Sequence, residues 1–195
     1  ETQIRPLQRR GTKVLLSLLG NHEGAGFANF PIRHDADRFA AQVARVVHRC
    51  HLDGVDLDDE YSEYGKNGTG QPNEDSFVWF VRALRRHLGP HKLLTLYSIG
   101  PSVDRTVSAV GNASDDLDYA WNPWYGTYQE PSVPGMPRSR LGAAAVDWGH
   151  TSTEMVQTMA SRTIRDGYGV FMTYDLRMST NPSLVQAMTT ALEKR

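Results

Sequence analysis

Short apolar runs that alternate with longer amphipathic stretches constrain the fold of this chain most. Runs of this length are typical of buried strands, and a loop and usually a helical pattern follow each of them. The predicted strands are Val14–Leu19, Gly54–Asp58, Leu93–Tyr97, Asp118–Trp121, Ala143–Trp148 and Gly169–Tyr174. The predicted helices are Asp35–Arg49, Glu74–Leu88, Thr153–Arg165 and Pro182–Glu193. This order predicts a parallel sheet covered by helices, in a single α/β domain over residues 1–195.

The charge balance and the cysteine content exclude several classes of protein. Lys and Arg number 21 and Asp and Glu number 22, so the net charge of −1 argues against a nucleic acid or an anionic membrane as partner. Cys50 is the only cysteine, which excludes internal disulfides and cysteine-rich zinc sites. No apolar run approaches the ~20 residues of a membrane-spanning helix. The first six residues lack the features of a signal peptide, so we expect either a removed targeting segment or a start inside something larger.

The segment Leu52–Tyr61 carries three acidic residues at alternate positions. Side chains alternate between the two faces of a strand, so Asp56, Asp58 and Glu60 are expected on one face and Val55 and Leu57 on the other. Acids in such a row are tolerable when they share protons and line a polar cavity. Their mutual repulsion raises some of the pKa values, so one carboxyl can stay protonated near neutral pH as a general acid. Glu60, at the carboxyl end of the strand, is best placed to reach a ligand.

Other interpretations of the acidic and glycine-rich segments fit the sequence less well. An EF-hand calcium loop requires glycine where Tyr61 stands, and a solvated edge strand would not place Val55 and Leu57 opposite the acids. His22 and His34 lack the His-Glu-x-x-His spacing of a zinc site. The segment 24–26 lacks the third glycine of a dinucleotide fingerprint. The sequence therefore predicts no metal and no cofactor.

The acidic strand matches a known family motif. Asp53, Asp56, Asp58 and Glu60 follow the Asp-x-x-Asp-x-Asp-x-Glu pattern of glycoside hydrolase family 18. Four segments in order resemble the bacterial endo-β-N-acetylglucosaminidases of the endoglycosidase H type. They are Lys13–Phe30, Asp53–Asn73, Tyr119–Thr127 and Gly167–Leu176. The resemblance implies a TIM (β/α)8-type barrel in which Gly54–Asp58 is the fourth strand, so we expect an incomplete barrel of about six parallel strands that lacks the first two.

The resemblance also implies a mechanism and its residues. Family 18 enzymes retain configuration by substrate assistance, since the 2-acetamido oxygen of the sugar attacks its own anomeric carbon. By this resemblance Glu60 is the general acid and then the base, Asp58 orients the acetamide group, and Asp56 shares a proton with Asp58. Asp53 is expected to be structural and to accept backbone hydrogen bonds at the entry of the strand.

Further residues are candidates for contact with the sugar. Tyr125, as a catalytic residue, and Asn122 are both expected to reach the acetamide oxygen or nearby hydroxyls. For Tyr125, packing at the rim is the alternative. Contacts with mannose hydroxyls or stacking on sugar faces are predicted for His22, Glu23, Tyr97, Trp124 and Tyr174. For each of the aromatic residues, burial in the barrel is the alternative.

The function implied is an endoglycosidase that cleaves the GlcNAc-β-1,4-GlcNAc core of N-linked, high-mannose glycans. A chitinase acting on chitin oligomers and a glycan-binding, lectin-like relic are the alternatives. The resemblance further predicts a secreted protein with a glycan or glycoprotein as substrate. Because the runs at Val14–Leu19 and Gly169–Tyr174 are apolar, the open barrel edges predict self-association.

Overall fold

The computed structural model describes residues 2–193, in two units, Glu1–Asp118 and Tyr119–Arg195. We describe each unit by itself. The prediction of one domain over the whole chain stays a prediction.

A parallel sheet of three strands forms the centre of the first unit. The strands are β1 (Leu15–Leu19), β2 (Gly54–Asp58) and β3 (Leu93–Tyr97). β2 pairs with β1 and with β3, and Leu19, Asp58 and Tyr97 lie at the same level of the register. The carboxyl ends of the strands therefore meet at one edge, where parallel α/β sheets carry their sites.

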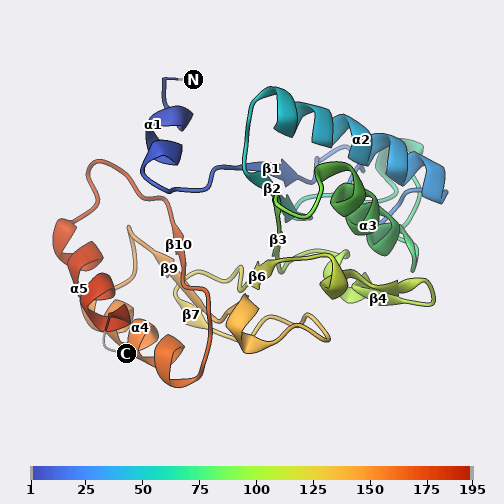
Figure 1. Cartoon of the computed structure of the whole chain (residues 1–195). Helices are drawn as coiled ribbons and strands as arrows, with labels where there is room; N and C mark the ends of the chain where they lie inside the picture. The colour runs from blue at the N-terminus through green and yellow to red at the C-terminus, as the bar shows by residue number, and fades with distance from the viewer. Residues whose placement is uncertain (1, 194–195) are drawn as a thin grey trace. The chain divides into compact units, whose positions relative to one another are not determined.

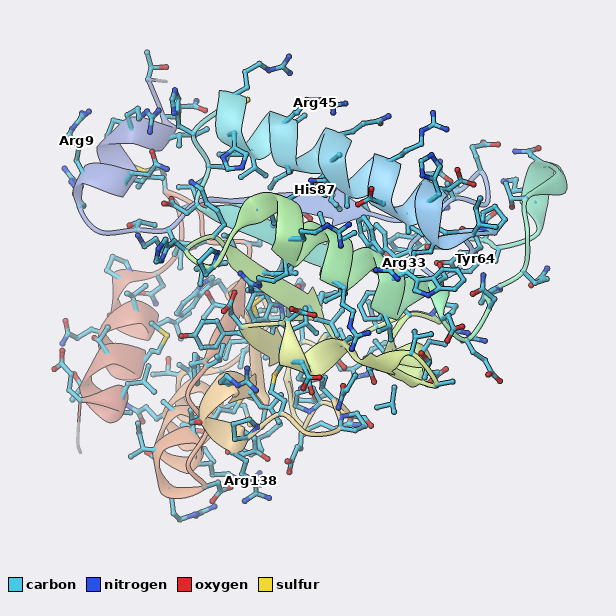
Figure 2. The ribbon with its side chains drawn as sticks, turned by 45° about the vertical axis from the view of Figure 1, so that its right-hand side comes forward. Arg9, Arg33, Arg45, Tyr64, His87 and Arg138 are labelled. Atoms are coloured by element: carbon cyan, nitrogen blue, oxygen red, sulfur yellow. The ribbon has the colours of Figure 1, made fainter. Side chains whose placement is uncertain are left out.

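Two amphipathic helices, α2 (Arg33–Arg49) and α3 (Ser76–Leu88), lie side by side along this sheet (Figure 1). Their apolar stripes are buried, while Arg45 points away from the sheet on the outer side of α2 (Figure 2). Phe80 is fully buried and its ring lies 5.4 Å from the rings of Phe27 and Phe30 and 5.5 Å from that of Phe39. This aromatic cluster fixes the loop that follows β1 against both helices.

Smaller elements complete the first unit. A short helix, α1 (Ile4–Arg9), precedes the sheet, and the Gln8 amide donates to the Asp53 carboxylate at 2.8 Å. β4 (Val107–Ser108) and β5 (Gly111–Asn112) form an antiparallel pair. The 3₁₀ turns are η1 (Lys66–Gly68), η2 (Val103–Arg105) and η3 (Ala113–Asp115).

The second unit combines short strands with two helices. β6 (Tyr119–Trp121) pairs in parallel with β8 (Leu141–Gly142), and β9 (Ala144–Asp147) pairs in parallel with β10 (Met172–Tyr174). β7 (Thr127–Tyr128) is antiparallel to β9, and η4 (Arg138–Arg140) precedes β8. Helices α4 (Thr153–Arg165) and α5 (Pro182–Leu192) pack together, as Figure 1 shows. The core here contains Val146, Trp148, Val156, Met159 and Leu184.

Most predicted elements are confirmed, and the differences have local causes. Asn181 caps α5 by accepting the Ser183 N–H, and Pro182 lies in the first turn. The last strand is shorter than predicted, because the Gly169 N–H donates to the Arg138 carbonyl before β10 begins. The two-residue strand β7, antiparallel to β9, is an addition that the sequence did not predict.

Candidate active site

The predicted acidic face exists on β2, the central strand of the first unit. Val55 and Leu57 are fully buried on one face of the strand, and the side chains of Asp56 and Asp58 alternate with them. The Thr95 hydroxyl, on the neighbouring strand, donates to the Asp56 carboxylate at 2.6 Å. The alternation of the sequence therefore places these two carboxyl groups side by side on one surface of the sheet.

Both carboxyl groups on β2 have raised pKa values. Burial raises the pKa of Asp56 to about 6, and the nearby Asp58 charge adds to this, while the Thr95 hydroxyl opposes it. Burial likewise raises the pKa of Asp58 to about 6, with further contributions from the charges of Glu60 and Asp59. The sequence predicted the direction from mutual repulsion, but burial is the larger cause. These groups change charge close to neutral pH, where general acid–base chemistry is most effective.

Glu60 lies just beyond the carboxyl end of β2. Its backbone N–H donates to the Asp58 carboxylate at 3.0 Å, which ties the peptide of Glu60 to the acid before it. Tyr61 and Glu63 follow with φ values of 62° and 41°, a region that costs non-glycine residues roughly 1–2 kcal/mol each. Glu60 lines an open groove of about 400 Å³ together with Tyr61, Tyr64 and residues of the loop after β3. A backbone held in this strained form next to a groove is typical of a functional site.

Asp59 is a site residue that the motif did not reveal. It is 1% exposed, and its two carboxylate oxygens accept hydrogen bonds from the residues Phe27, Ser62, Tyr64 and Ser102. Strand alternation assigns Asp59 to the apolar face, but β2 ends at Asp58 and the rule stops there. The signal available in the sequence was an acid on the apolar side of the alternation, since such an acid requires buried donors.

His22 and Glu23 are both exposed in the loop after β1, and His22 contacts two residues that line the groove, Tyr61 and Glu63. His22 Nδ1 lies 3.1 Å from a carboxylate oxygen of Glu63, and its ring centroid lies 4.9 Å from that of Tyr61. The Asn67 amide donates to the Glu23 carboxylate. The loops after β1 and β2 are thus joined beside Glu60, where both predicted sugar contacts are accessible.

Tyr97, at the carboxyl end of β3, lies opposite Asp58 in the register. It is 6% exposed, so most of its ring is covered. The structure thus brings together Asp56, Asp58, Glu60 and Tyr97 at one edge of the sheet, with His22 and Glu23 in the loop beside it.

The other predicted site residues belong to the second unit. Trp124 and Tyr174 are about half exposed, and the ring of Tyr174 stacks on that of Tyr125 with centroids 4.6 Å apart. Tyr125 lines a groove of about 310 Å³ together with Asp147 and His150. These exposed rings offer flat apolar faces of the kind on which sugars stack.

Asn122 has a structural role that the sequence did not predict. It is 1% exposed, and its amide donates to the Thr127 hydroxyl and to the Ala143 carbonyl, both at 2.9 Å. Its oxygen accepts the Trp124 N–H at 2.9 Å. These bonds shape the loop that presents Trp124 and Tyr125. The catalytic and binding roles of all the residues above stay predictions.

Within residues 2–193, no group of three or more His, Cys, Asp or Glu side chains is arranged to hold a metal ion. Across the same residues, no helix combines the length and the apolar character that crossing a membrane requires.

Comparison with known proteins links this geometry to one family. The model of the family described as glycosyl hydrolases family 18 matches residues 2–180. The chain is 54% identical over 191 residues to an endo-beta-N-acetylglucosaminidase of Flavobacterium sp. (strain SK1022), covering 98% of this chain and 60% of that protein. It is 30% identical over 177 residues to endo-beta-N-acetylglucosaminidase F1 of Elizabethkingia meningoseptica. This match covers 88% of this chain and 51% of that protein. The chain thus spans only about half to three fifths of these relatives.

A solved structure gives the same assignment of fold. EndoBT-3987 of Bacteroides thetaiotamicron, with Man5GlcNAc product, is 28% identical with a TM-score of 0.73, over 98% of this chain and 44% of that one. For the same protein in complex with Man9GlcNAc2Asn substrate, the sequence identity is 26% and the TM-score is 0.72. The predicted fold class, an incomplete α/β barrel of the TIM (β/α)8 type, is therefore confirmed.

Proposed function

Since the chain belongs to glycosyl hydrolases family 18, we propose that it acts as an endo-β-N-acetylglucosaminidase on N-linked, high-mannose glycans. The proposal places the cut between the two GlcNAc residues of the glycan core. Two relatives carry the name of this activity, and the structural neighbour was solved with glycans of this type.

The arrangement of Asp56, Asp58 and Glu60 is the observation that carries the proposal. Two carboxyl groups whose pKa values lie at about 6 stand on one face of β2, and Glu60 follows at the rim of a groove. Substrate-assisted hydrolysis needs one acid to protonate the leaving oxygen and one carboxylate to stabilise positive charge. The three residues offer both groups within one short segment.

Glu60 is the proposed general acid and base. In the first step the acetamide oxygen forms a bond to the anomeric carbon, the bond to the leaving oxygen breaks, and Glu60 gives its proton to that oxygen. In the second step water attacks the anomeric carbon, Glu60 takes a proton from the water, and the oxazolinium ring opens. Holding the acetamide group in place makes the first attack intramolecular, which lowers the barrier by several kcal/mol.

Asp58 is the proposed partner of the acetamide group. As a carboxylate it accepts the acetamide N–H and stabilises the oxazolinium cation. Its pKa of about 6 makes this carboxylate available near neutral pH. Asp56, whose pKa is also about 6 and is raised in part by the charge of Asp58, is proposed to share a proton with Asp58.

The remaining predicted residues are proposed to bind the glycan. His22 and Glu23 contact mannose hydroxyls, and Tyr97 contributes the part of its ring that is accessible. From the second unit we assign contacts to the residues Trp124, Tyr125 and Tyr174, while the buried Asn122 acts on the glycan only through the loop that it holds.

A comparison of two substrates tests this proposal. The purified chain is offered a high-mannose glycopeptide and chitin oligomers, and the products are measured by mass spectrometry. We expect cleavage of the glycopeptide, which leaves one GlcNAc on the peptide. Glu60→Gln keeps the shape of the side chain but removes the transferable proton, so we expect a loss of at least about 10²–10⁴-fold in turnover with glycan binding retained. Turnover near that of the wild type by Glu60→Gln would refute the assignment.

Two other outcomes correspond to the alternative functions. Preferential cleavage of chitin oligomers would make the chain a chitinase. Binding of glycans without turnover would make it a lectin-like protein, although Glu60 and the three motif aspartates are all present.

Secretion and self-association complete the proposal. The family resemblance supports secretion, which fractionation of the source culture would test. For self-association the support is β1, which pairs only with β2 in the described sheet and exposes 55% of Leu19. Size-exclusion chromatography of the chain at several concentrations tests it, and a monomer throughout would exclude it.

A further inference from the structure

Asp59 is a buried carboxylate on which three loops of the first unit converge. Oδ1 accepts the Ser62 hydroxyl at 2.5 Å, the Tyr64 hydroxyl at 2.6 Å and the Phe27 N–H at 3.4 Å. Oδ2 accepts the Ser102 hydroxyl at 2.6 Å and the Ser102 N–H at 2.9 Å. Every partner donates, so the group acts as an acceptor on both oxygens, as an ionised carboxylate does.

The donors come from the loops that follow β1, β2 and β3. Phe27 belongs to the first loop, Ser62 and Tyr64 to the second, and Ser102 to the third. Figure 2 shows Tyr64 among these loops, at the end of the unit where α2 begins. The Tyr64 hydroxyl also accepts the Ala28 N–H at 3.0 Å, which links the first two loops a second time.

Two glycines allow the loops to approach Asp59 closely. A Cβ atom at Gly26 would collide with the Asp59 carboxylate and with the hydroxyls of Ser62 and Tyr64. At Gly100, where φ is 80°, a Cβ would collide with the backbone carbonyl of Asp59. The loops are therefore packed against this residue by backbone as well as by hydrogen bonds.

We propose that Asp59 is a positioning residue, which fixes the peptide carrying Glu60 by joining the loops after β1, β2 and β3 to one buried carboxylate. The proposal rests on the proposed function, in which Glu60 is the general acid. It assigns to Asp59 no contact with the substrate.

The local backbone explains why such a support is needed. The Glu60 N–H is held on one side by Asp58, and Tyr61 and Glu63 adopt positive φ values immediately afterwards. Such a backbone persists only where its surroundings hold it. The hydrogen bonds that Asp59 accepts from the Ser62 and Tyr64 hydroxyls hold the two ends of the segment 59–64 together. Their loss should therefore allow Glu60 to move.

The charge of Asp59 supplies a second effect, on the acid beside it. Burial is the largest cause of the raised pKa of Asp58. The negative charges of Glu60 and Asp59 raise it further. The other titratable groups around Asp58 and Asp59 are Asp56 on the same strand, Tyr97 opposite in the register, and Tyr64. Removing the charge of Asp59 should therefore lower the pKa of Asp58.

The experiment compares Asp59→Asn with Asp53→Asn on the full chain. Asp53 is also an aspartate of the motif, but it accepts the Val14 N–H at the other end of β2. For Asp59→Asn we expect kcat to fall by about 100-fold, the size of effect that a displacement of about 1 Å produces, with a smaller change in KM. The acid limb of its pH–rate profile should move to lower pH. Asp53→Asn should lower Tm and leave kcat and the acid limb unchanged.

The outcomes decide between positioning and a purely structural role. A lower Tm for Asp59→Asn with unchanged kcat and an unchanged acid limb would overturn the proposal. If Asp59→Asn does not fold, Ser102→Ala and Tyr64→Phe, which each remove one hydroxyl donor, are measured in the same way. A fall in kcat in both supports the proposal, and unchanged kcat in both overturns it.

Failure of the proposed function is recognised separately. If the wild-type chain turns over no glycan, that function is wrong, and Asp59 is then assessed without activity. The readouts are the carboxyl titration of Asp58 by NMR and the amide hydrogen exchange of residues 59–64. A lower pKa of Asp58 and faster exchange in Asp59→Asn than in Asp53→Asn support the positioning role, and equal values in the two variants overturn it.

Discussion

Substitution of Asp56 by asparagine should stabilise the protein at neutral pH. Asn is close in shape to a protonated aspartate, and its side-chain oxygen can still accept the Thr95 hydroxyl, so the packing on β2 is kept. The difference lies in ionisation, since the carboxyl group of the wild type must lose a proton in a buried position. Asn cannot ionise and carries no such cost.

The size and sign of the effect follow from the pKa of Asp56, which is 3.8 ordinarily and about 6 in the fold. Because the folded-state pKa is the higher one, the folded chain retains a proton that the unfolded chain releases between these two values. The free energy of unfolding therefore falls as pH rises from about 4 to about 6, and it stays lower above that. The difference between the two pKa values of Asp56, at about 1.4 kcal/mol per pKa unit, lowers the free energy of unfolding at pH 7 by about 3 kcal/mol. Asp56→Asn should regain most of it.

Urea unfolding of the wild type and Asp56→Asn between pH 4 and pH 8 measures this difference. We expect nearly equal stability at pH 4 and an advantage of the variant that grows to pH 7. Asp53→Asn is the matched control of opposite sign: burial favours a higher pKa of Asp53, but the Val14 N–H, the Gln8 amide and nearby lysines outweigh it and lower the pKa. That variant should lose stability relative to the wild type as pH rises. An advantage of Asp56→Asn that does not change with pH would refute the reasoning.

Three further predictions concern the site and the two cores. Asp58→Asn should keep the fold and lose affinity for a thiazoline mimic of the oxazolinium intermediate, because an amide cannot offset the positive charge; equal binding by calorimetry would contradict this. Phe80→Ala should lower the free energy of urea unfolding by about 3–5 kcal/mol, since it empties the centre of the aromatic cluster; a loss under about 1 kcal/mol would contradict the packing. Asn122→Ala should lower the free energy of urea unfolding by about 1–3 kcal/mol, because the Trp124 N–H and the Ala143 carbonyl each lose a hydrogen-bond partner. An unchanged free energy of unfolding would show that these bonds are dispensable.

Much of the fold was predictable because the strands and helices have strong periodicity. β2, β3 and α4 have the predicted bounds, and α3 ends at the predicted residue, Leu88, with Gly89 as its C-cap. The helix α1 was not predicted, since it is six residues long, buries no residue and is held by the distant contact of Gln8 with Asp53. β7 was missed because a two-residue strand has no period.

The site was predictable as far as strand alternation extends. It placed Asp56 and Asp58 on one face. The expectation that Asp53 accepts a backbone hydrogen bond at the entry of the strand is confirmed, and the donor is the Val14 N–H at 2.9 Å. Alternation ends with β2, so the burial of Asp59 depends on loops that come together only in the folded chain. The same holds for Asn122, whose partners lie in a loop and in a neighbouring segment.

The close approach of Gly26 and Gly100 to Asp59 has a consequence for laboratory evolution of this chain. A library that randomises the loops around Glu60 would lose most members with any side chain at these two positions, because a Cβ would strike Asp59. His22 and Glu23 are exposed in the loop after β1 and should tolerate wide variation, whereas the left-handed backbone of Tyr61, with φ 62°, disfavours branched residues. If the chain has the proposed function, changes in glycan preference are therefore best sought at His22 and Glu23, with both glycines kept constant.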